Sequence, residues 1–343
     1  MRLAIDATNL AHDRRGMGRV VRPIVRAACA DPRFEVTLLA KPAAYDALRA
    51  DFGSSVSIDQ PARAGKRGRF DAVWLPFNGM RFACAAPALV TIYDVFAFTE
   101  PAAGVVARWR EQTPIRRAAK RARRIVTISQ WSAQSIVDIL GVDEQRIRII
   151  LPAPDPFFFP APGDALPSEV QGTSFVLLIG GREGRKNNAL AIEAATLALR
   201  APEERLAVVG ALNDADEARL QSCGVPLVRL HADDEMLRAL YRNASLVLVP
   251  SRGEGFGLVA AEAIACGAPV IAANAAALPE ATGDAAVLLD PDDTALWATA
   301  IRRLLDDERE RDTLRARATA RWSLDRDGPV RAMLDELRDT AGP

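Results

Sequence analysis

Residues 247–290 hold the densest group of side chains that could do chemistry, reading VLVPSRGEGFGLVAAEAIACGAPVIAANAAALPEATGDAAVLLD. Two carboxylates, Glu254 and Glu262, stand eight residues apart, the first inside the glycine-rich run 253–257. The first is in a loop and the second lies about one turn into the expected helix, so they do not share one face as a paired acid and base would. We expect both to accept hydrogen bonds from ligand hydroxyl groups.

The elements around these carboxylates form a strand, loop, helix and strand. An apolar strand over 246–249 stops at a proline, the glycine loop follows, and an alanine-rich helix over 258–266 ends at a glycine before the strand 270–273. In such a βαβ unit the helix N-terminus presents unpaired N–H groups that suit a phosphate. The N–H groups expected at the phosphates are those of Gly255, Phe256, Gly257 and Leu258. A ligand with a diphosphate between two sugar rings fits, with one carboxylate for each ring. The alternative is a tight turn with a surface glutamate and a capping glutamate.

The spacing of this run resembles a known family. The E-x7-E pattern, followed by ACGxPV and LPE-x-x-GDAA segments, is similar to the signature of family-four retaining glycosyltransferases of the GT-B fold. The resemblance implies an α/β protein with two doubly wound Rossmann-like domains facing across a cleft, and a C-terminal helix that crosses back to the first domain. It also implies transfer of a sugar from a nucleoside-diphosphate sugar to an acceptor hydroxyl, with Glu254 as a catalytic residue and Glu262 on the ribose.

A second glycine loop, GGREGRKN at 180–187, precedes the helix expected over 189–199. Cations beside a helix N-terminus suit a phosphate leaving group. The loop resembles the family's G-R-x-x-x-R-K-N diphosphate clamp but is two residues shorter, which assigns Lys186 and Arg182 to the departing diphosphate. A helix start with solvated basic residues is the alternative. Arg229, at the end of the strand expected over 226–230, is either a contact to the nucleotide base or an exposed strand end.

The first domain carries a glycine pair and one departure from the family. Gly16 and Gly18 follow the first strand, and the resemblance implies that this loop reaches the donor's phosphate and sugar; Arg22 stands where a dinucleotide motif would have its third glycine. The segment TIYDVFAFTEP at 91–101 resembles the family's T-I-H-D-L motif, whose histidine touches the donor sugar. Tyr93 replaces that histidine here and is followed by Asp94, so both are candidate catalytic residues.

Length and composition set the domain organisation. The chain has 343 residues and 49% hydrophobic content, which allows two cores. We expect an N-terminal acceptor-side domain over 1–164, a nucleotide-sugar domain over 165–322 and a terminal helical segment over 323–343. The proline-rich stretch 156–173 is the expected linker.

Cysteine usage and apolar runs predict the compartment. Four irregularly spaced cysteines and two histidines favour a reducing cytoplasm and offer no structural zinc site, and no signal peptide or membrane-spanning run is evident. No cofactor is expected besides the donor. Transfer should need no divalent metal, because no Asp-x-Asp follows a strand, and the acidic pairs at 233–234 and 292–293 fit a turn and a helix start.

The zero net charge conceals an asymmetry. Residues 1–165 carry 24 lysines and arginines against 16 aspartates and glutamates, and the stretch 108–124 holds eight basic residues and one acid. This stretch is either a solvated helix face or a surface attracted to an anionic membrane or to a phosphorylated acceptor. The expected partners are a nucleotide sugar and an acceptor with a free hydroxyl, lipid-linked or phosphorylated, in the cytoplasm or at the inner face of the membrane; no nucleic acid is expected.

Two other classes stay open. The tyrosine at position 93 is compatible with a GT-B protein that binds a nucleotide sugar but has lost turnover. A sugar-nucleotide epimerase or a phosphorylase on the same fold would need buried acid and base residues in the first domain or a lysine for pyridoxal phosphate, and neither is identifiable. The chain also shows no His-Asp-Ser or Cys-His set for a covalent step.

Overall fold

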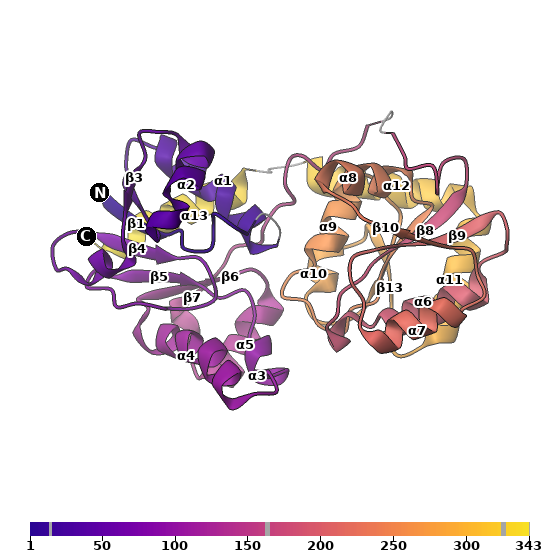
Figure 1. The fold of residues 1–343 in the computed structure, drawn as a ribbon, viewed down its shortest axis with the longest axis horizontal. Helices are drawn as coiled ribbons and strands as arrows, with labels where there is room; N and C mark the ends of the chain where they lie inside the picture. Colours follow the sequence, from indigo (N-terminus) through magenta and orange to yellow (C-terminus); the bar gives the residue numbers. More distant parts are fainter. Residues whose placement is uncertain (14–15, 162–164, 324–326, 343) are drawn as a thin grey trace. The chain divides into compact units, whose positions relative to one another are not determined.

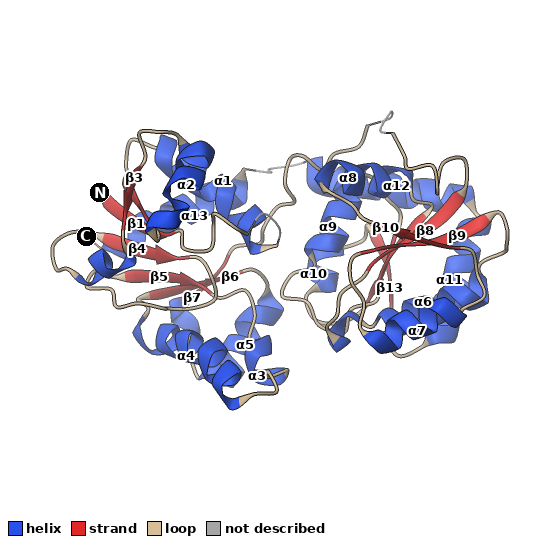
Figure 2. Ribbon diagram, viewed as in Figure 1, coloured by secondary structure: helices blue, strands red, loops and turns tan. Residues whose placement is uncertain are grey.

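The computed structural model describes residues 1–13, 16–161, 165–323 and 327–342. The chain divides into two compact units, Met1–Ala153 with Asp327–Pro343, and Pro154–Arg326. Each unit is a parallel sheet covered by helices on both faces (Figures 1 and 2). This is the doubly wound α/β architecture expected from the alternation of strands and helices.

The N-terminal unit contains a seven-stranded sheet in the order β3-β2-β1-β4-β5-β6-β7. Its strands are β1 (Arg2–Asp6), β2 (Glu35–Leu39), β3 (Ser57–Asp59), β4 (Ala72–Leu75), β5 (Ala88–Thr91), β6 (Arg124–Thr127) and β7 (Ile147–Ile149). Its helices are α1 (Met17–Ala30), α2 (Tyr45–Phe52), α3 (Phe96–Thr99), α4 (Val105–Arg121), α5 (Gln130–Leu140) and α13 (Gly328–Ala341), with 3-10 turns at Pro42–Ala44, Pro61–Gly65 and Glu144–Arg146. Helices α1, α2 and α13 cover one face of the sheet, and α3, α4 and α5 cover the other (Figure 2).

Strand order places the functional edge of this sheet. All paired strands run parallel, and the order reverses between β1 and β4, which lie side by side with Leu3 opposite Ala72. Ligands of doubly wound sheets bind beyond the carboxyl ends of the strands near such a reversal. Gly16 and Gly18 follow β1 in the chain and Tyr93 follows β5, so the topology puts these candidates at the carboxyl edge.

The last helix of the chain completes the N-terminal unit. Helix α13 packs on α1, β4 and β5. Ion pairs hold it, Arg33 to Asp335 at 3.1 Å, Arg124 to Glu336 at 3.0 Å and Arg148 to Glu336 at 3.8 Å. The terminal segment was expected from residue 323; the unit takes the chain back at Asp327, and residues 324–326 lie outside the described part.

The C-terminal unit contains a six-stranded sheet in the order β10-β9-β8-β11-β12-β13. Its strands are β8 (Ser174–Ile179), β9 (Glu204–Val209), β10 (Leu227–Leu230), β11 (Leu246–Val249), β12 (Val270–Ala273) and β13 (Ala286–Leu289). Its helices are α6 (Asn188–Ala198), α7 (Asp214–Ser222), α8 (Asp234–Asn243), α9 (Leu258–Ala265), α10 (Leu278–Thr282), α11 (Thr294–Asp306) and α12 (Glu308–Ser323), with a 3-10 turn, η4 (Gly184–Lys186). Helices α6, α7 and α11 lie on one face, and α8, α9 and α12 on the other (Figure 2).

The aromatic triplet in the expected linker belongs to the C-terminal core. Phe158 is 1% exposed and contacts Tyr241 of α8, with their ring centroids 6.0 Å apart. Arg238 stacks 4.1 Å from the centre of the Phe157 ring, and Arg242 stacks 4.5 Å from that of Phe159. The unit boundary therefore lies after Ala153 instead of at residue 164. The surrounding prolines had suggested a linker, but three consecutive aromatic rings are stabilised by burial.

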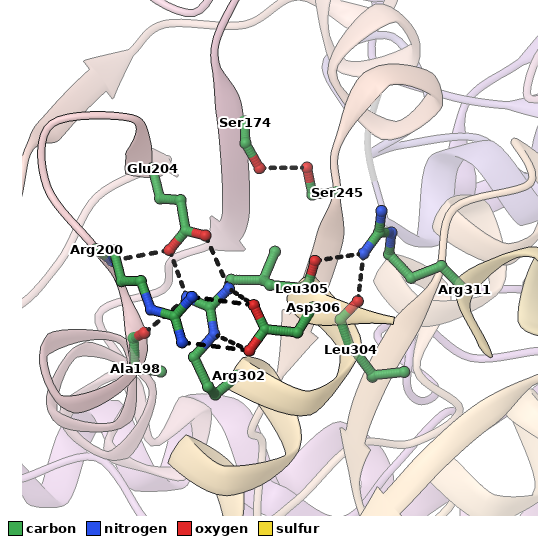
Figure 3. A network of polar contacts seen from close by, with 10 residues as sticks. All are labelled: Ser174, Ala198, Arg200, Glu204, Ser245, Arg302, Leu304, Leu305, Asp306 and Arg311. Carbon is green, nitrogen blue, oxygen red and sulfur yellow. Dashed lines mark hydrogen bonds and ion pairs between the residues drawn. The ribbon is translucent and has the colours of Figure 1, made fainter. Parts of the chain in front are cut away.

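A polar network ties the amino edge of the C-terminal sheet together (Figure 3). Arg302 of α11 donates to both carboxylate oxygens of Glu204 at the start of β9, at 2.7 and 2.9 Å, and to Asp306. Burial by itself would raise the pKa of the Glu204 carboxyl, but the hydrogen bonds from Arg302 and from the Arg200 N–H outweigh it and lower that pKa. The network fastens α11 to the edge opposite the two glycine loops.

Candidate functional site

The two glycine loops of the C-terminal unit meet through an ion pair. Strands β8 and β11 are neighbours in the sheet, so the loops that leave their carboxyl ends lie side by side. Lys186 Nζ, from the end of η4, donates to Glu254 Oε1 at 2.7 Å. The lysine side chain is 21% exposed and the glutamate side chain 15% exposed. The lysine and the glutamate, which were predicted from separate motifs, are thus in contact, and both side chains remain partly exposed.

Asn187 holds these loops together. Its backbone is left-handed, with φ of 54°, and its Nδ2 donates to the Pro250 carbonyl at 3.2 Å and to the Pro291 carbonyl at 2.9 Å. The Arg252 N–H adds a 2.7 Å bond to the Arg185 carbonyl. The sequence reading passed over Asn187 as a site residue. The available signal was an asparagine directly before a helix, since asparagine tolerates this left-handed conformation.

Two glycines are required by close packing. Gly257 has φ of 104°, and a Cβ there would lie 2.7 Å from Leu278 Cδ2. A Cβ on Gly181 would lie 2.8 Å from Lys186 Cγ, so this glycine makes room for the lysine side chain. Helix α9 begins directly after Gly257 without a side-chain cap. The first-turn N–H groups of α9 therefore remain available to an anion.

The other residues expected at the donor site differ in accessibility. Glu262, in the second turn of α9, is 5% exposed, and Phe256 is 2% exposed, so the Phe256 ring is buried. Arg182 is exposed, and no carboxylate in the described part of the chain pairs with its guanidinium. Arg229 donates to Glu217 Oε1 and to the Gly210 carbonyl, both at 3.0 Å, so it would have to leave these partners to contact a base.

In the N-terminal unit, Tyr93 lies just beyond β5 and is 5% exposed. Its N–H donates to Asn78 Oδ1 at 2.7 Å, and its carbonyl accepts from Ser132 Oγ at 2.8 Å. Burial raises the pKa of the phenol, and the negative charge of Asp13 raises it further. Asn78 was missed as a positioning residue, although an Asn-Gly pair is a common signal of a left-handed turn.

The first glycine loop is braced by Asp13 and Arg22. The Gly18 N–H donates to Asp13 Oδ2 at 3.1 Å, and a Cβ on Gly18 would lie 1.9 Å from the Asp13 carbonyl oxygen. Arg22, on α1, pairs with Asp51 and donates to the Asp13 carbonyl at 3.2 Å. Gly16 takes φ of 54° just before α1. Arg22 therefore replaces a third glycine with a side chain that fixes the loop.

Asp94 has a local structural partner. Its Oδ1 accepts from the Phe96 N–H at 3.1 Å, at the start of α3. This bond holds the carboxylate near the carboxyl edge of the sheet, next to Tyr93 in the chain. The contact accounts for one of its oxygens.

Neither a metal cluster nor a membrane span is found in the residues that the structure describes. No three His, Cys, Asp or Glu side chains there come together as a metal site would need. Likewise, no helix among them is long and apolar enough to cross a bilayer.

Comparison with known proteins finds a family match within the C-terminal unit. Residues 174–307 match the family model described as glycosyl transferases group 1. Of the candidate residues this segment contains Arg182, Lys186, Arg229, Glu254 and Glu262.

Curated relatives are identical to this chain at about a third of the aligned positions. The D-inositol 3-phosphate glycosyltransferase of Acidothermus cellulolyticus is 31% identical over 241 residues, which cover 64% of this chain and 53% of that protein. O-antigen chain mannosyltransferase B of Escherichia coli is 29% identical over 247 residues, covering 68% and 65%. The chain spans about half the length of the D-inositol 3-phosphate glycosyltransferases that it matches.

Solved structures establish the fold of the whole chain. The HepE protein of Anabaena, solved with UDP, superposes with a TM-score of 0.75 at 17% identity, covering 98% of this chain and 99% of HepE. WaaG, a glycosyltransferase involved in lipopolysaccharide biosynthesis, superposes with a TM-score of 0.72 at 17% identity, covering 98% and 99%. The fold is GT-B, as the sequence predicted, with a Rossmann-like domain in each unit.

Proposed function

We propose that this protein is a retaining glycosyltransferase that moves a sugar from a nucleoside-diphosphate sugar to an acceptor hydroxyl. The observation that carries the proposal is the 2.7 Å pair between Lys186 and Glu254, set beside the uncapped start of α9 within the family-matched segment. HepE, which has the same fold, has been solved with UDP-glucose as well as with UDP. A nucleotide-sugar donor therefore suits this fold and this group of charges.

The donor's diphosphate occupies the space between the two glycine loops. Lys186, Arg182 and the N–H groups of residues 255–258 bind it, while Glu254 accepts from a hydroxyl of the sugar and Glu262 from the ribose. Because Lys186 is already oriented by Glu254, it reaches the phosphate without a large rearrangement. Negative charge grows on the departing diphosphate as the sugar bond breaks, and these fixed donors stabilise it there. The acceptor hydroxyl attacks the same face, which retains the sugar's configuration without a covalent enzyme intermediate.

Within the N-terminal unit, the residues proposed for a phosphate and a sugar are Gly16 and Gly18, and those proposed for a sugar are Tyr93 and Asp94. The acceptor is a free hydroxyl on a polysaccharide, a glycolipid or a small metabolite, lipid-linked or phosphorylated. The names of two relatives, one acting on D-inositol 3-phosphate and one on the O-antigen chain, support this range.

A donor screen tests the proposal. Thermal denaturation should be measured against UDP-, GDP-, ADP- and dTDP-sugars, because a ligand at 100 times its dissociation constant adds about 2.7 kcal/mol to the free energy of unfolding. We expect one nucleotide series to raise the melting temperature and Lys186→Ala to abolish that rise. The proposal fails if no nucleotide or nucleotide sugar stabilises the wild-type protein.

A binding protein without turnover is the second candidate, and the burial of Tyr93 favours it. At 5% exposure, the Tyr93 phenol offers a sugar little accessible surface. Slow hydrolysis of a bound donor separates the two candidates. An enzyme releases the sugar and nucleoside diphosphate at a measurable rate, and a binding protein shows stabilisation with no release.

We also propose that α4 brings the N-terminal unit to an anionic membrane on the cytoplasmic side. Before and within the basic stretch 108–124, Val105 is 75% exposed, Val106 is 70% exposed and Trp109 is 65% exposed. Apolar and tryptophan side chains among cations are typical of helices at a bilayer interface. All four cysteines are free thiols, which suits a reducing cytoplasm.

Liposome sedimentation tests the membrane contact. Binding to vesicles with phosphatidylglycerol should exceed binding to phosphatidylcholine vesicles at low salt, and raised salt should weaken it. Trp109→Ser should reduce binding, whereas Leu197→Ser should not, because Leu197 is a similarly exposed residue (69%) on α6, away from the basic stretch. Absence of binding at low salt leaves the stretch as a solvated helix face.

A further inference from the structure

A cavity of about 470 Å³ lies against the second half of α4. Its walls are Ala83, Thr113, Arg116, Arg117, Lys120 and Arg121. The end of this helix lies at the amino edge of the sheet, because the Arg123 N–H, two residues beyond it, bonds to the carbonyl of Ala88 at the start of β5. The cavity therefore extends toward the amino edge of the sheet, whereas Tyr93 follows the carboxyl end of β5, and none of its lining residues is a candidate for the transfer site.

The charge of this cavity is of one sign. Four of its six lining residues are cations and none is an acid. Arg116 is held with its guanidinium 4.9 Å from the centre of the Phe98 ring. No carboxylate among the described residues forms an ion pair with Arg117, Lys120 or Arg121. Arg117 is partly buried as a residue, whereas Arg116, Lys120 and Arg121 are exposed.

A second basic cavity of the same unit gives the contrast. This cavity, of about 440 Å³, includes Arg2, Lys66, Arg67 and Arg69 in its walls, but Glu35 lines it too. Arg2 pairs with Asp71 at 2.7 Å and Arg69 pairs with Asp59 at 2.6 Å. In that cavity, carboxylates of the protein itself pair with two of the arginines, whereas no acidic residue lines the cavity at α4.

The spacing of the α4 cations brings like charges together, which is unfavourable without a bound anion. Arg116 and Lys120 are four residues apart, as are Arg117 and Arg121, so like charges lie next to each other on the helix surface. The helix dipole favours cations in the last turn, which accounts for Lys120 and Arg121. It does not account for Arg116 and Arg117, one turn earlier. A bound anion would offset the repulsion among all four.

We propose that this cavity binds a phosphate group, with Arg116, Arg117, Lys120 and Arg121 as its cations and the Thr113 hydroxyl as a further donor. Arginine forks suit phosphate oxygens, and a cavity of this size holds a phosphate with part of the group that it esterifies. The phosphate belongs to a lipid headgroup or to a soluble phosphate ester, and the chemistry is the same for both. The inference goes beyond sugar transfer because it needs no donor.

The test measures phosphate binding in protein that carries Lys186→Ala, which removes one of the two cations proposed for the donor diphosphate. Glycerol 3-phosphate is titrated by calorimetry at low salt, and vesicles of phosphatidylglycerol or phosphatidylcholine are tested in parallel. Arg117→Gln with Arg121→Gln should weaken binding at least tenfold. The matched control, Arg108→Gln with Arg110→Gln, removes two exposed cations of the same helix outside the cavity and should change the affinity for glycerol 3-phosphate less than twofold.

Three further outcomes decide the proposal. Thr113→Val leaves the charge unchanged and should weaken binding several-fold if the cavity is a built site. Binding of the soluble ester supports the proposal, and so does a loss of binding to phosphatidylglycerol vesicles that is larger in the Arg117 and Arg121 variant than in the Arg108 and Arg110 variant; the probe that binds identifies the source of the phosphate. The proposal is overturned if neither probe binds, or if both double variants lose affinity equally while their circular dichroism stays native, since equal loss indicates general attraction to a basic helix.

Discussion

Removing the lysine of the ion pair should cost both transfer and stability, by amounts that the contact predicts. Lys186 and Glu254 meet at 2.7 Å with 21% and 15% of their side chains exposed. A hydrogen bond between charged groups contributes about 1.5–3 kcal/mol, and for a domain of this size each kcal/mol moves the melting temperature by about 2–4 °C. We therefore expect Lys186→Ala to lower the melting temperature of the C-terminal unit by about 3–12 °C, with the protein still folded at 25 °C.

The loss of transfer should be larger than the loss of stability. A donor that stabilises charge only as the diphosphate departs contributes about 100- to 1000-fold to the rate. Lys186→Ala should lower kcat by that factor or more. Glu254→Gln keeps a hydrogen-bond acceptor at 254 but removes its charge, so it should reduce transfer while changing the melting temperature less than the alanine variant does.

The assay combines calorimetric melting with transfer from the nucleotide sugar that stabilises the wild type. Lys41→Ala is the matched control, because Lys41 is an exposed lysine of the N-terminal unit. It should match the wild type in both measurements. Near-normal transfer by purified Lys186→Ala would refute the site assignment, and an unchanged melting temperature would refute the energy ascribed to the pair.

Three other predictions concern metal, pH and acid stability. Transfer should continue in EDTA, and activity that is lost there and restored by magnesium or manganese would contradict the expected metal independence. Because burial and Asp13 raise the pKa of the Tyr93 phenol, it stays neutral, and the rate should show no titration from this position between pH 5 and 8; Tyr93→His should introduce one, and identical pH profiles would count against a contact to the sugar. The pKa of Glu204 is lower in the folded protein than in the unfolded chain, where it is about 4.3, so the ionised carboxylate stabilises the fold when the pH is above that value. This contribution to stability is lost as the pH falls through the pKa of the folded state. Glu204→Gln should thus flatten the loss of stability below about pH 4.5 in urea melts, and an unchanged slope would show that the Arg302 pair does not supply it.

Sequence patterns were most reliable where local conformation decides the structure. The glycine run 253–257 between apolar stretches predicted a strand, loop and helix, and the structure contains β11 (Leu246–Val249) and α9 (Leu258–Ala265) there. Gly257 illustrates the reason, because its positive φ belongs to the residue's own backbone preference. The short strand β3 (Ser57–Asp59) was not predicted, because it pairs only at the edge of the sheet and carries little apolar signal.

Other features were decided by contacts between residues far apart in the chain. Lys186 and Glu254 were each recognised from a motif, but their 2.7 Å pairing joins positions 68 residues apart and depends on β8 and β11 being neighbours in the sheet. Asn187 and Asn78 position their loops through hydrogen bonds to backbone groups of other segments, the Pro250 carbonyl for Asn187 and the Tyr93 N–H for Asn78, so the local sequence does not show these roles. The boundary after Ala153 likewise depends on the packing of the Phe158 ring against Tyr241 of α8. The sequence by itself determined most of the elements, because these follow from local backbone preference and apolar periodicity, and its motifs indicated the fold class and the candidate site residues. The tertiary structure decided which of those residues are in contact. Burial and hydrogen bonding between distant segments leave no pattern in the local sequence around either partner.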